Sequence, residues 1–327
     1  MAMMRIRSML RIIGRSTALL VAALAFPLSA GAADVRLGLV GTDTSHVIGF
    51  AAAFNDPSSP EHIPGARIVA AFKGGSPDVA QSRDRIEGFT RQLQEKYGVE
   101  VVGSIAELCA RVDGVLLTSV DGRVHLAQAR EIIKGKRPMF IDKPLAATLD
   151  DAREIARLAK DAGVPWFSTS TLRYSVAHLK TPDLAGVDVW GPGPFEEHHP
   201  LDLAWYAIHE AEMLFTLLGR GCEEVTRVDS ADASVVTCRW KDGRIGTMRA
   251  LRPYSDYGVV SFLKNPKGFT SQSTAVKTST AELDRQVVAF FTSGVPPVPN
   301  EDTLELMAFM DAAQRSKAAG GQPMRLR

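Results

Sequence analysis

The sequence has few cysteines, no apolar run long enough to cross a membrane and almost no net charge. Its 327 residues include only Cys109, Cys222 and Cys238, so at most one disulfide can form, and a hydrophobic core must supply most of the stability. The cysteines are too far apart in sequence to form a cysteine-ligated metal cluster of the usual spacing. A formal net charge of +1 gives no indication of a nucleic-acid partner.

Residues 1–32 differ from the rest of the chain. Four arginines precede the apolar run 18–26, and small residues follow at Ala30-Gly31-Ala32. This pattern is typical of a secretory signal peptide that is cleaved near Ala32. A membrane anchor is the alternative, but this run is far shorter than the roughly 20 residues that span a bilayer as a helix. We therefore expect a periplasmic or secreted protein without a stable membrane anchor.

Strands and helices alternate over the first part of the mature chain. Thr148 and Asp151 form a capping box at the start of one predicted helix, and Gly163 ends it. Such alternation predicts βαβ units and a parallel sheet with helices on both faces. Short apolar runs rich in β-forming residues predict strands at 36–40, 66–72, 114–119, 139–141 and 164–168.

The pattern changes after about residue 175. A long helical pattern over 203–218 leads into β-rich segments, and the turn Lys241-Asp242-Gly243 predicts a hairpin between strands at 234–240 and 244–252. Two further helices are expected near 281–293 and 301–317. We predict an α/β protein of two domains. The first, 33–174, contains a parallel sheet, and the second, 175–327, is an α+β domain with an open, mainly antiparallel sheet.

The loop after the first predicted strand lies where parallel sheets bind ligands. In the spacing G-x-G-x-x-G, Gly41 fills the first place, but Asp43 and His46 stand in place of the other two glycines. The second glycine normally lets the backbone approach a pyrophosphate, and a carboxylate there repels it. Three hydroxyls of this loop either contact a phosphate at the helix N-terminus or serve only as helix caps: those of Thr42, Thr44 and Ser45.

Several separate motifs resemble the glucose-fructose oxidoreductase / inositol dehydrogenase (Gfo/Idh/MocA) family. His125 begins a helix as the family's histidine does, and Gly135-Lys136 precedes the strand at 139–141. Asp142-Lys143-Pro144 stands in the place of the family's Glu-Lys-Pro, and Arg173 matches an arginine after the next strand. The segment IHEAEMLFTLLG at 208–219 resembles the family's histidine helix. The C-terminal helix is also similar, so the resemblance covers nearly the whole mature chain.

The resemblance implies a dinucleotide-binding Rossmann domain followed by a substrate and oligomerisation domain. It also implies oxidation or reduction of a hydroxyl or keto group of a sugar, cyclitol or related small molecule with NAD or NADP. Lys143 would be the acid–base group at the reacting oxygen, and His209 a proton relay or substrate ligand. Glu212 matches an acidic position that can hold the imidazole in one tautomer.

The remaining site residues are expected from their positions relative to the family pattern, and Asp43, Lys73 and Trp205 among them depart from that pattern. Arg173, Trp205 and His209 are expected at the substrate. The cofactor contacts are expected from Gly41, Thr42, Asp43, Thr44, Ser45, Lys73, Ser119, His125, Asp142 and Lys143.

Three departures from the family pattern affect these expectations. Trp205 replaces an aspartate one helical turn before His209, and its indole could stack on a sugar ring. Lys73 ends a strand that lacks an acid for the ribose 2′-hydroxyl, which slightly favours NADP over NAD. We expect Asp43 to turn outward or to cap the helix, so that backbone N–H groups and the loop hydroxyls hold the pyrophosphate.

The segment EEHHP at 196–200 contains two adjacent histidines. His198, His199 and His209 could together bind a divalent metal, but adjacent side chains usually point apart and the helix has no i, i+4 histidine pair. A polar rim of the substrate cleft is favoured over a metal site, and an ordinary exposed loop is the third interpretation.

Two classes of function agree with the sequence. The first is an exported enzyme with a tightly held nicotinamide cofactor, acting as a dehydrogenase or through transient oxidation that permits elimination or hydrolysis. The second is a sugar-binding protein of the same fold without redox chemistry, which the altered glycine loop favours. In either case a small carbohydrate-like molecule is the expected ligand. The open second sheet predicts a homo-oligomer, because such a face is commonly covered by self-association.

Overall fold

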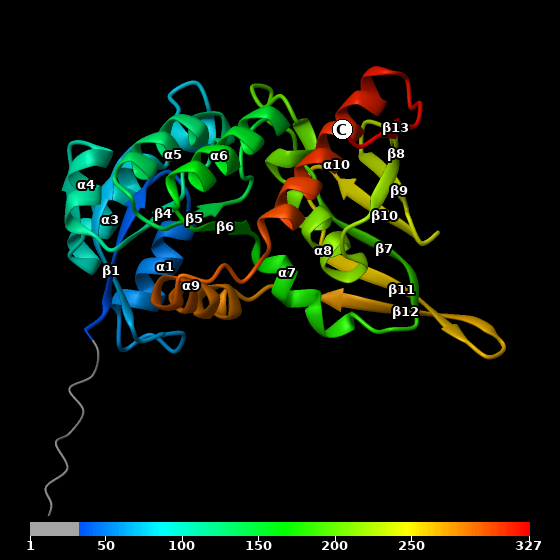
Figure 1. The fold of residues 1–327 in the computed structure, drawn as a ribbon, viewed down its shortest axis with the longest axis horizontal. Helices are drawn as coiled ribbons and strands as arrows, with labels where there is room; N and C mark the ends of the chain where they lie inside the picture. Colours follow the sequence, from blue (N-terminus) through cyan, green and yellow to red (C-terminus); the bar gives the residue numbers. More distant parts are fainter. Residues whose placement is uncertain (1–32) are drawn as a thin grey trace, which may run out of the picture. The chain divides into compact units, whose positions relative to one another are not determined.

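Two β-sheets organise residues 33–327, which are the residues that this computed structural model describes (Figure 1). The predicted signal peptide, residues 1–32, lies outside the described residues. Residues 33–327 form one compact unit. No helix in this unit has the length and apolar character needed to cross a bilayer.

The first sheet is wholly parallel, as the alternating pattern predicted. Its strand order is β3-β2-β1-β4-β5-β6, which is the doubly wound order of a Rossmann fold. The three-residue β3 was not predicted, because so short a run has no readable period. The strands are β1 (Val35–Val40), β2 (Ala66–Phe72), β3 (Glu100–Val102), β4 (Gly114–Leu117), β5 (Met139–Asp142) and β6 (Trp166–Thr169).

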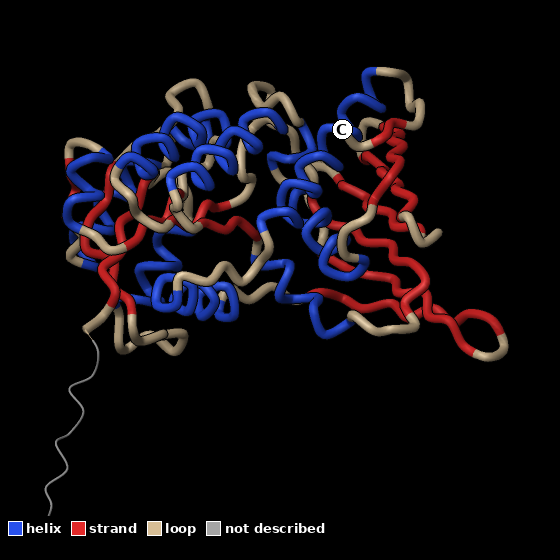
Figure 2. The backbone as a smooth tube through the Cα atoms, viewed as in Figure 1, coloured by secondary structure: helices blue, strands red, loops and turns tan. Residues whose placement is uncertain are grey.

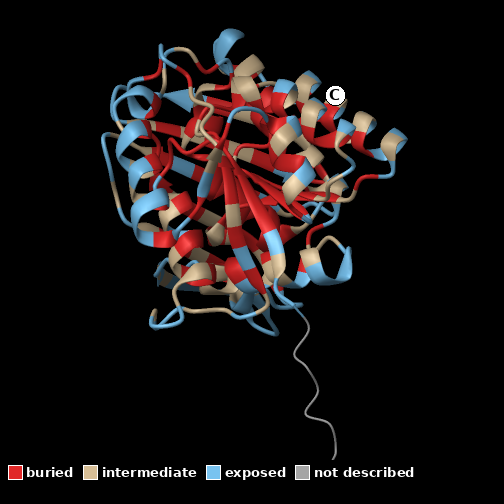
Figure 3. Cartoon of the chain, turned by 90° about the vertical axis from the view of Figure 1, so that its left-hand side faces the viewer, coloured by how far each residue is buried: buried red, intermediate tan, exposed pale blue. Residues whose placement is uncertain are grey.

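Helices cover both faces of this sheet (Figures 1 and 3). The apolar faces of α4 (Ile105–Arg111), α5 (His125–Lys134) and α6 (Leu149–Ala162) pack on one side. On the other side lie α1 (His46–Asn55), α3 (Ile86–Tyr97) and α9 (Ala281–Ser293). The capping prediction for α6 is confirmed, since Thr148 Oγ1 accepts from Asp151 N at 3.0 Å and Gly163 has a φ of 66°.

The helix α9 comes from the end of the chain and completes the first sheet. Phe290 packs edge-on to Phe167 of β6, with ring centroids 4.9 Å apart, and Leu283 and Val287 join the same cluster. The predicted boundary at 174/175 therefore separates the strands of the two sheets but not the helices that cover them.

The second sheet is mixed and mostly antiparallel. Its order is β12-β11-β7-β10-β9-β8-β13, and the β7–β10 pair alone among these is parallel. The helices α8 (Ile208–Leu218) and α10 (Asn300–Ala318) cover one face (Figure 2). The strands are β7 (Leu184–Pro192), β8 (Cys222–Asp229), β9 (Ala233–Trp240), β10 (Ile245–Leu251), β11 (Tyr257–Asn265), β12 (Gly268–Val276) and β13 (Met324–Arg325).

The hairpin between β9 and β10 is confirmed, with Gly243 at a φ of 85° in its turn. The single helix predicted over 203–218 is wrong. The backbone of Tyr206 leaves the helical region, which separates the 3₁₀ turn η3 (Asp202–Trp205) from α8. The remaining short elements are α2 (Ala80–Arg83), η1 (Gly122–Val124), α7 (Thr171–Val176) and η2 (Ala177–Leu179).

One disulfide joins neighbouring strands of the second sheet. Cys222 of β8 and Cys238 of β9 are bonded, with their Cα atoms 6.0 Å apart, and Cys109 is free and buried. The sequence limited the chain to one pair without deciding which, and the strand register brings these two together.

Candidate active site

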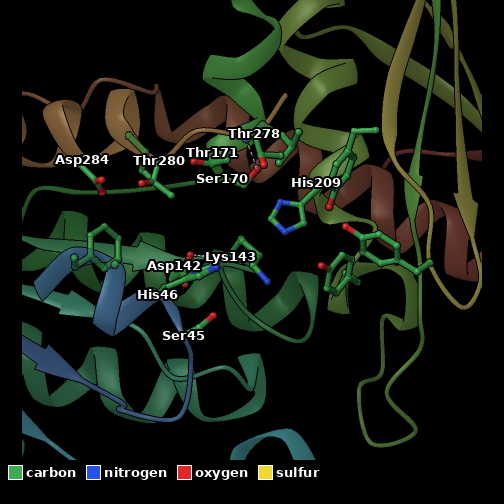
Figure 4. Close-up of a pocket in the computed structure, with 17 residues that line it drawn as sticks. Ser45, His46, Asp142, Lys143, Ser170, Thr171, His209, Thr278, Thr280 and Asp284 are labelled. Carbon is green, nitrogen blue, oxygen red and sulfur yellow. Dashed lines mark hydrogen bonds and ion pairs between the residues drawn. The ribbon is translucent and has the colours of Figure 1, made fainter. Parts of the chain in front are cut away.

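A cavity of about 390 Å³ lies where the carboxyl ends of β5 and β6 meet the second sheet (Figure 4). This volume is in the range of small-molecule sites. Its walls come from the start of α1, from the loop after β5, from α7, α8 and α9, and from the segment before β11. The lining residues include Ser45, His46, Phe50, Asp142, Lys143, Ser170, Thr171, Tyr206, His209, Tyr254, Tyr257, Thr280 and Asp284.

Lys143 reaches this cavity because β5 ends at Asp142. Its ammonium lies 5.6 Å from the centre of the Tyr206 ring, so an electron-rich face helps to hold the cation. Burial lowers the pKa of Lys143 below its ordinary value, Asp142 opposes this shift, and the nearby positive charge of Arg85 adds to it. The neutral amine is therefore more accessible than in an exposed lysine.

Asp142 links the end of β5 to the first turn of α1. One carboxylate oxygen accepts from the backbone N of Lys143 at 2.9 Å, and the other lies 2.5 Å from Nδ1 of His46. Burial alone would raise the pKa of Asp142, but His46 and Lys143 hold it below its ordinary value. Because the carboxylate is the acceptor, Nδ1 of His46 carries the hydrogen and Nε2 is the nitrogen left for another partner.

His209 faces Lys143 from the first turn of α8 (Figure 4). Its ring lies 5.5 Å from that of Tyr206 and 6.1 Å from that of Tyr257. Burial lowers the pKa of His209 well below its ordinary value, and the charges of Lys143 and His46 lower it further. Its buried Nδ1 has no hydrogen-bond partner among residues 33–327, so the neutral imidazole is left to bind a ligand.

Most of the lining residues escaped the sequence reasoning, and four of them carry ionisable side chains that bear on the chemistry. His46 was noted only as a missing glycine, and nothing local indicated Tyr206, Tyr257 or Asp284 as site residues. Asp284 comes from α9, which returns to the first sheet, and burial raises the pKa of this carboxyl to about 6. Its place on the apolar face of a predicted helix indicates a buried carboxyl group, but this alone does not assign the residue to a site.

The prediction that Asp43 turns outward or caps α1 is wrong. Its side chain is fully buried, and its two carboxylate oxygens accept from Ser82 Oγ at 2.6 Å and from Val120 N at 3.1 Å. The carboxylate can remain inside the protein because Ser82 and the backbone of Val120, which come from other parts of the chain, donate hydrogen bonds to it. Asp43 therefore ties together the loops after β1 and β4 and the helix α2, and its charge does not face a ligand.

The three hydroxyls of the β1–α1 loop have different surroundings. Thr42 Oγ1 is buried 2.6 Å from Thr90 Oγ1, and Thr44 Oγ1 accepts from His46 N at 3.4 Å. Ser45 is exposed at the start of α1, and its side chain makes no cap hydrogen bond. Of the three, Ser45 is best placed to meet a phosphate.

Two residues that were predicted to contact the cofactor, Ser119 and His125, make hydrogen bonds within the protein after the end of β4. The ring nitrogens of His125 lie 2.8 Å from the carbonyl oxygen of Ser119 and 3.2 Å from that of Leu145. Ser119 Oγ donates to Gln128 at 2.9 Å. A Cβ on Gly41, which has a φ of 93°, would lie 2.3 Å from Ser119 Oγ, so this position requires glycine for close packing.

Lys73 lies just beyond the end of β2, as predicted. Its ammonium pairs with Glu87 of α3, whose side chain is 70% exposed, and the Lys73 side chain is 40% exposed. An exposed pair of this kind is worth at most about 1 kcal/mol, so Lys73 can exchange Glu87 for another anion at little cost.

Three residues that were predicted near the substrate, Glu212, Arg173 and Trp205, do not line the pocket. Glu212 was expected to hold the imidazole of His209, and this is wrong, because it accepts from Arg173 Nε at 2.7 Å and from Thr169 at 3.1 Å. Arg173 is thus engaged in a buried ion pair and is not among the lining residues. Trp205 is buried, with its ring 5.9 Å from that of His199, and is likewise absent from the lining.

The histidines of the EEHHP segment are not brought together with His209. His198 Nδ1 lies 2.7 Å from Glu196, and His199 Nδ1 lies 2.9 Å from the carbonyl oxygen of Leu201. His199 is buried and so does not form a rim. Across residues 33–327, no three His, Cys, Asp or Glu side chains gather in a way that could hold a metal ion.

The groups left around the β1–α1 loop fit the phosphates of a dinucleotide. The start of α1 offers its N-terminal backbone and the free hydroxyl of Ser45, which suit an anion. Arg85 is close enough to act on the charges of both Asp43 and Lys143, and so it adds a cation to this region. Asp43 does not present its carboxylate oxygens to the anion, because the side chain is buried and both oxygens accept internal hydrogen bonds.

Comparison with known proteins agrees with this arrangement. Residues 37–170, less than half of the chain, match the family model described as "Oxidoreductase family, NAD-binding Rossmann fold". A 1,5-anhydro-D-fructose reductase of Ensifer adhaerens is 35% identical over 78 residues. That match covers 24% of this chain and 23% of the reductase, so it spans about a quarter of each protein.

Solved structures show the same fold over a longer part of the chain. An oxidoreductase from Agrobacterium radiobacter, in complex with NAD⁺, L-tartaric acid and magnesium, has a TM-score of 0.68 and is 16% identical, covering 90% of this chain and 99% of that one. The apo scyllo-inositol dehydrogenase of Lactobacillus casei has a TM-score of 0.64 at 13% identity, covering 90% and 98%. Residues 37–170 are therefore similar in sequence to the NAD-binding Rossmann domain of the Gfo/Idh/MocA oxidoreductase family, and the solved structures show the likeness of the fold alone.

Proposed function

We propose that the protein is an NAD(P)-dependent oxidoreductase that interconverts a hydroxyl and a keto group on a sugar, cyclitol or related small molecule. The observation that carries the proposal is that Lys143 and His209 face each other across one pocket at the carboxyl end of a Rossmann sheet (Figure 4). The nicotinamide, when bound, supplies or accepts the hydride. The phosphates are assigned to Ser45, the start of α1 and Arg85.

Lys143 is the acid–base group of the proposed reaction. In oxidation its neutral amine accepts the proton of the substrate hydroxyl, and in reduction its ammonium donates a hydrogen bond to the carbonyl oxygen. The lowered pKa of Lys143 makes the neutral form available nearer to neutral pH. A proton-transfer group in this position typically contributes about 10²- to 10⁴-fold to the rate.

His209 orients the substrate beside Lys143. Its imidazole stays neutral because its pKa is lowered by burial, and a neutral ring can both donate and accept a hydrogen bond. The unpaired Nδ1 then finds its partner in a substrate hydroxyl. Rings of Tyr206 and Tyr257 border the same space and present apolar faces to the C–H groups of a carbohydrate-like ring.

Export and self-association complete the proposal. The disulfide between Cys222 and Cys238 agrees with an oxidising compartment, where the cofactor must be held tightly because no soluble pool supplies it. On the second sheet, Ile245 and Phe269 are 55% and 68% exposed and, with Phe262, line a shallow hollow that suits a second copy of the chain. Light scattering that shows only monomer would remove the oligomer from the proposal.

The experiment that tests the function is the release of bound small molecules from the purified protein by denaturation. We expect NAD or NADP at close to one per chain, or binding of added NAD or NADP by protein purified without it. A protein that neither releases nor binds either dinucleotide contradicts the proposal and leaves the sugar-binding alternative.

The pH dependence gives a second test on a substrate found among sugars and cyclitols. Oxidation needs the neutral amine of Lys143, so its rate should rise with pH through an inflection below 10.5, the ordinary pKa of lysine. Reduction needs the ammonium and should fall with pH through the same inflection. A rate that is independent of pH in both directions excludes Lys143 as the acid–base group.

A further inference from the structure

A second cavity, of about 450 Å³, shares no lining residue with the pocket beyond β5. It lies where α6 meets the start of β8, the β9–β10 hairpin, α10 and the segment around β13 (Figure 1). We call it the basic groove, after its five cationic lining residues, which are Arg153, Arg239, Lys241, Arg325 and Arg327. None of them belongs to the proposed reaction, so a ligand of this groove is separate from the proposed substrate.

Positive charge is concentrated in the basic groove. The whole chain has 38 basic and 37 acidic residues, whereas the five cations of the groove are accompanied by two carboxylates only, those of Glu223 and Glu305. Oε1 of Glu305 accepts from the backbone N of Gly221 at 2.5 Å and from that of Cys222 at 3.0 Å. Glu223 lies 3.2 Å from the guanidinium of Arg239. Both carboxylates are thus engaged within the protein, and the surplus of cations attracts an anion.

Two of the five cations have no anionic partner within residues 33–327. Lys241 and Arg325 are exposed, and their side chains form neither an ion pair nor a hydrogen bond with this part of the chain. The other three cations each lie within 4.0 Å of a carboxylate oxygen. The hydrogen-bond donors of Lys241 and Arg325 are therefore left for an anion from outside the chain.

One wall of the basic groove is apolar. Leu304 of α10 and Leu326 contribute side chains that are only partly buried against the core, and Ala308 lies one turn further along α10. Such a wall suits the C–H groups of a ring, whereas a bare ion would contact the cations alone. The volume is also in the range of small-molecule sites. The groove therefore fits an anionic group that is attached to a carbohydrate-sized body.

We propose that the basic groove binds a sugar phosphate or a similar small phosphate monoester, with the phosphate at Lys241 and Arg325 and the ring beside Leu304 and Leu326. A phosphate monoester carries about −1.5 to −2 charges at pH 7 and three acceptor oxygens, so it can engage an ammonium and a guanidinium together. The planar guanidinium of Arg325 can donate two parallel hydrogen bonds to it. A carboxylate has a single charge and leaves one of the two cations unmatched.

A ligand in the basic groove contacts elements that belong to both sheets. Arg153 comes from α6, which covers the first sheet, whereas Lys241 follows β9 and Arg325 lies in β13 of the second sheet. A molecule that binds these residues only when they are brought together stabilises the folded chain by mass action. The site does not depend on the proposed function, because it shares no residue with the pocket that contains Lys143.

The test is calorimetric titration of the purified protein with glucose 6-phosphate, glucuronate and inorganic phosphate. We expect glucose 6-phosphate to bind most tightly and glucuronate to bind at least about tenfold more weakly, which is the effect of one charge-assisted hydrogen bond. Inorganic phosphate should also bind more weakly, because it leaves the apolar wall uncovered. Absence of binding by glucose 6-phosphate overturns the proposal, and so does an equal affinity for either of the other two anions.

Paired variants separate the groove from a general attraction of anions to the chain. The double variant Lys241→Ala/Arg325→Ala should bind glucose 6-phosphate at least about tenfold more weakly, and the ligand should no longer raise its unfolding midpoint. Lys264→Ala/Lys267→Ala is the matched control, since it removes the same charge from exposed lysines of the β11–β12 hairpin, outside the groove. An equal loss of affinity in the control variant overturns the proposal.

The proposed cofactor site also attracts phosphate, so its contribution is measured separately. Arg85→Ala removes a cation beside the β1–α1 loop and should not change the affinity for glucose 6-phosphate. Binding that is lost in Arg85→Ala, or that persists undiminished in Lys241→Ala/Arg325→Ala, belongs to another site and overturns the proposal. Loss of NAD and NADP binding in the unmodified protein, with glucose 6-phosphate still bound at the groove, contradicts the proposed function alone.

Discussion

Two regions of the molecule differ in how their buried polar groups are hydrogen-bonded. One consists of the loops after β1 and β4, and the other is the pocket beyond β5. In the first region the groups satisfy one another, since Ser82 donates to Asp43 and Ser76 Oγ donates to Asp121, each at 2.6 Å. In the second region Asp142 is paired, but the buried Nδ1 of His209 has no partner among residues 33–327. Beside His209 in α8, but outside the pocket lining, both carboxyl oxygens of Glu210 are also unpaired within these residues. Internal pairing gives stability and shape, whereas an unpaired group is a cost that a ligand can remove.

The largest effect is expected when the ammonium of Lys143 is removed from the pocket. Lys143→Ala should lower the rate of hydride transfer by about 10²- to 10⁴-fold, because the reacting oxygen loses its acid–base group. The free energy of unfolding, measured with urea, should change little. Lys134→Ala, at an exposed surface pair with Glu131, is the control and should keep the rate. A Lys143→Ala rate within tenfold of the unmodified protein would contradict the assignment.

Removing a hydrogen-bonded group from the loops after β1 and β4 should instead lower the free energy of unfolding. Asp43→Ala leaves Ser82 Oγ and Val120 N without their acceptor and should lower the free energy of unfolding by about 1–3 kcal/mol. Asp84→Ala removes a carboxylate that is 63% exposed and should have almost no effect. Equal unfolding midpoints for the two variants would show that Asp43 is not a structural residue.

Glu210 provides a pH-dependent comparison. Burial raises its pKa well above 4.5, so the folded protein binds a proton that the unfolded chain releases. This contribution is fully present below pH 4.5, and as the pH rises toward the folded pKa, stability should fall by up to about 1.4 kcal/mol per unit. Glu210→Gln should remove that part of the slope and be the more stable protein at neutral pH. A slope identical in both proteins would count against a protonated Glu210.

The smallest effect is expected at Lys73, where the pairing is exposed. Lys73→Ala removes the ion pair with Glu87 and one candidate contact to a 2′-phosphate. Since exposed pairs contribute at most about 1 kcal/mol, the ratio of NADP to NAD affinity should fall by no more than about fivefold. Calorimetric titration with each dinucleotide measures this ratio, and an unchanged ratio would remove Lys73 from the cofactor site.

Local sequence patterns were enough to predict the site residues that lie at the ends of strands and helices. The run at 139–141 predicted β5 and so placed Lys143 at its end, and the helical pattern before Leu218 placed His209 on α8. The pair of His46 with Asp142 could not be predicted in this way, because it joins elements through the fold and not through a local period. Trp205 was misjudged for the same reason, since the break at Tyr206 separates it from the helix of His209.

The glycine loop shows the limit of a motif. The motif correctly located the β1–α1 turn and the need for glycine at position 41, where Ser119 approaches closely. It gave no information on which way Asp43 turns, because Ser82 and the backbone of Val120 come from separate loops. A substitution in a motif is therefore interpretable only together with the partners that the rest of the chain brings to it.

The return of α9 to the first sheet has a consequence for synthesis of the chain. Until residues 281–293 have emerged, Phe140 and Phe167 belong to an apolar surface that lacks its last covering helix. The N-terminal half should therefore remain incompletely folded until nearly the whole polypeptide is made. Such a delay agrees with the export that we propose, since a chain that is still unfolded can be translocated whereas a folded first half would block its passage.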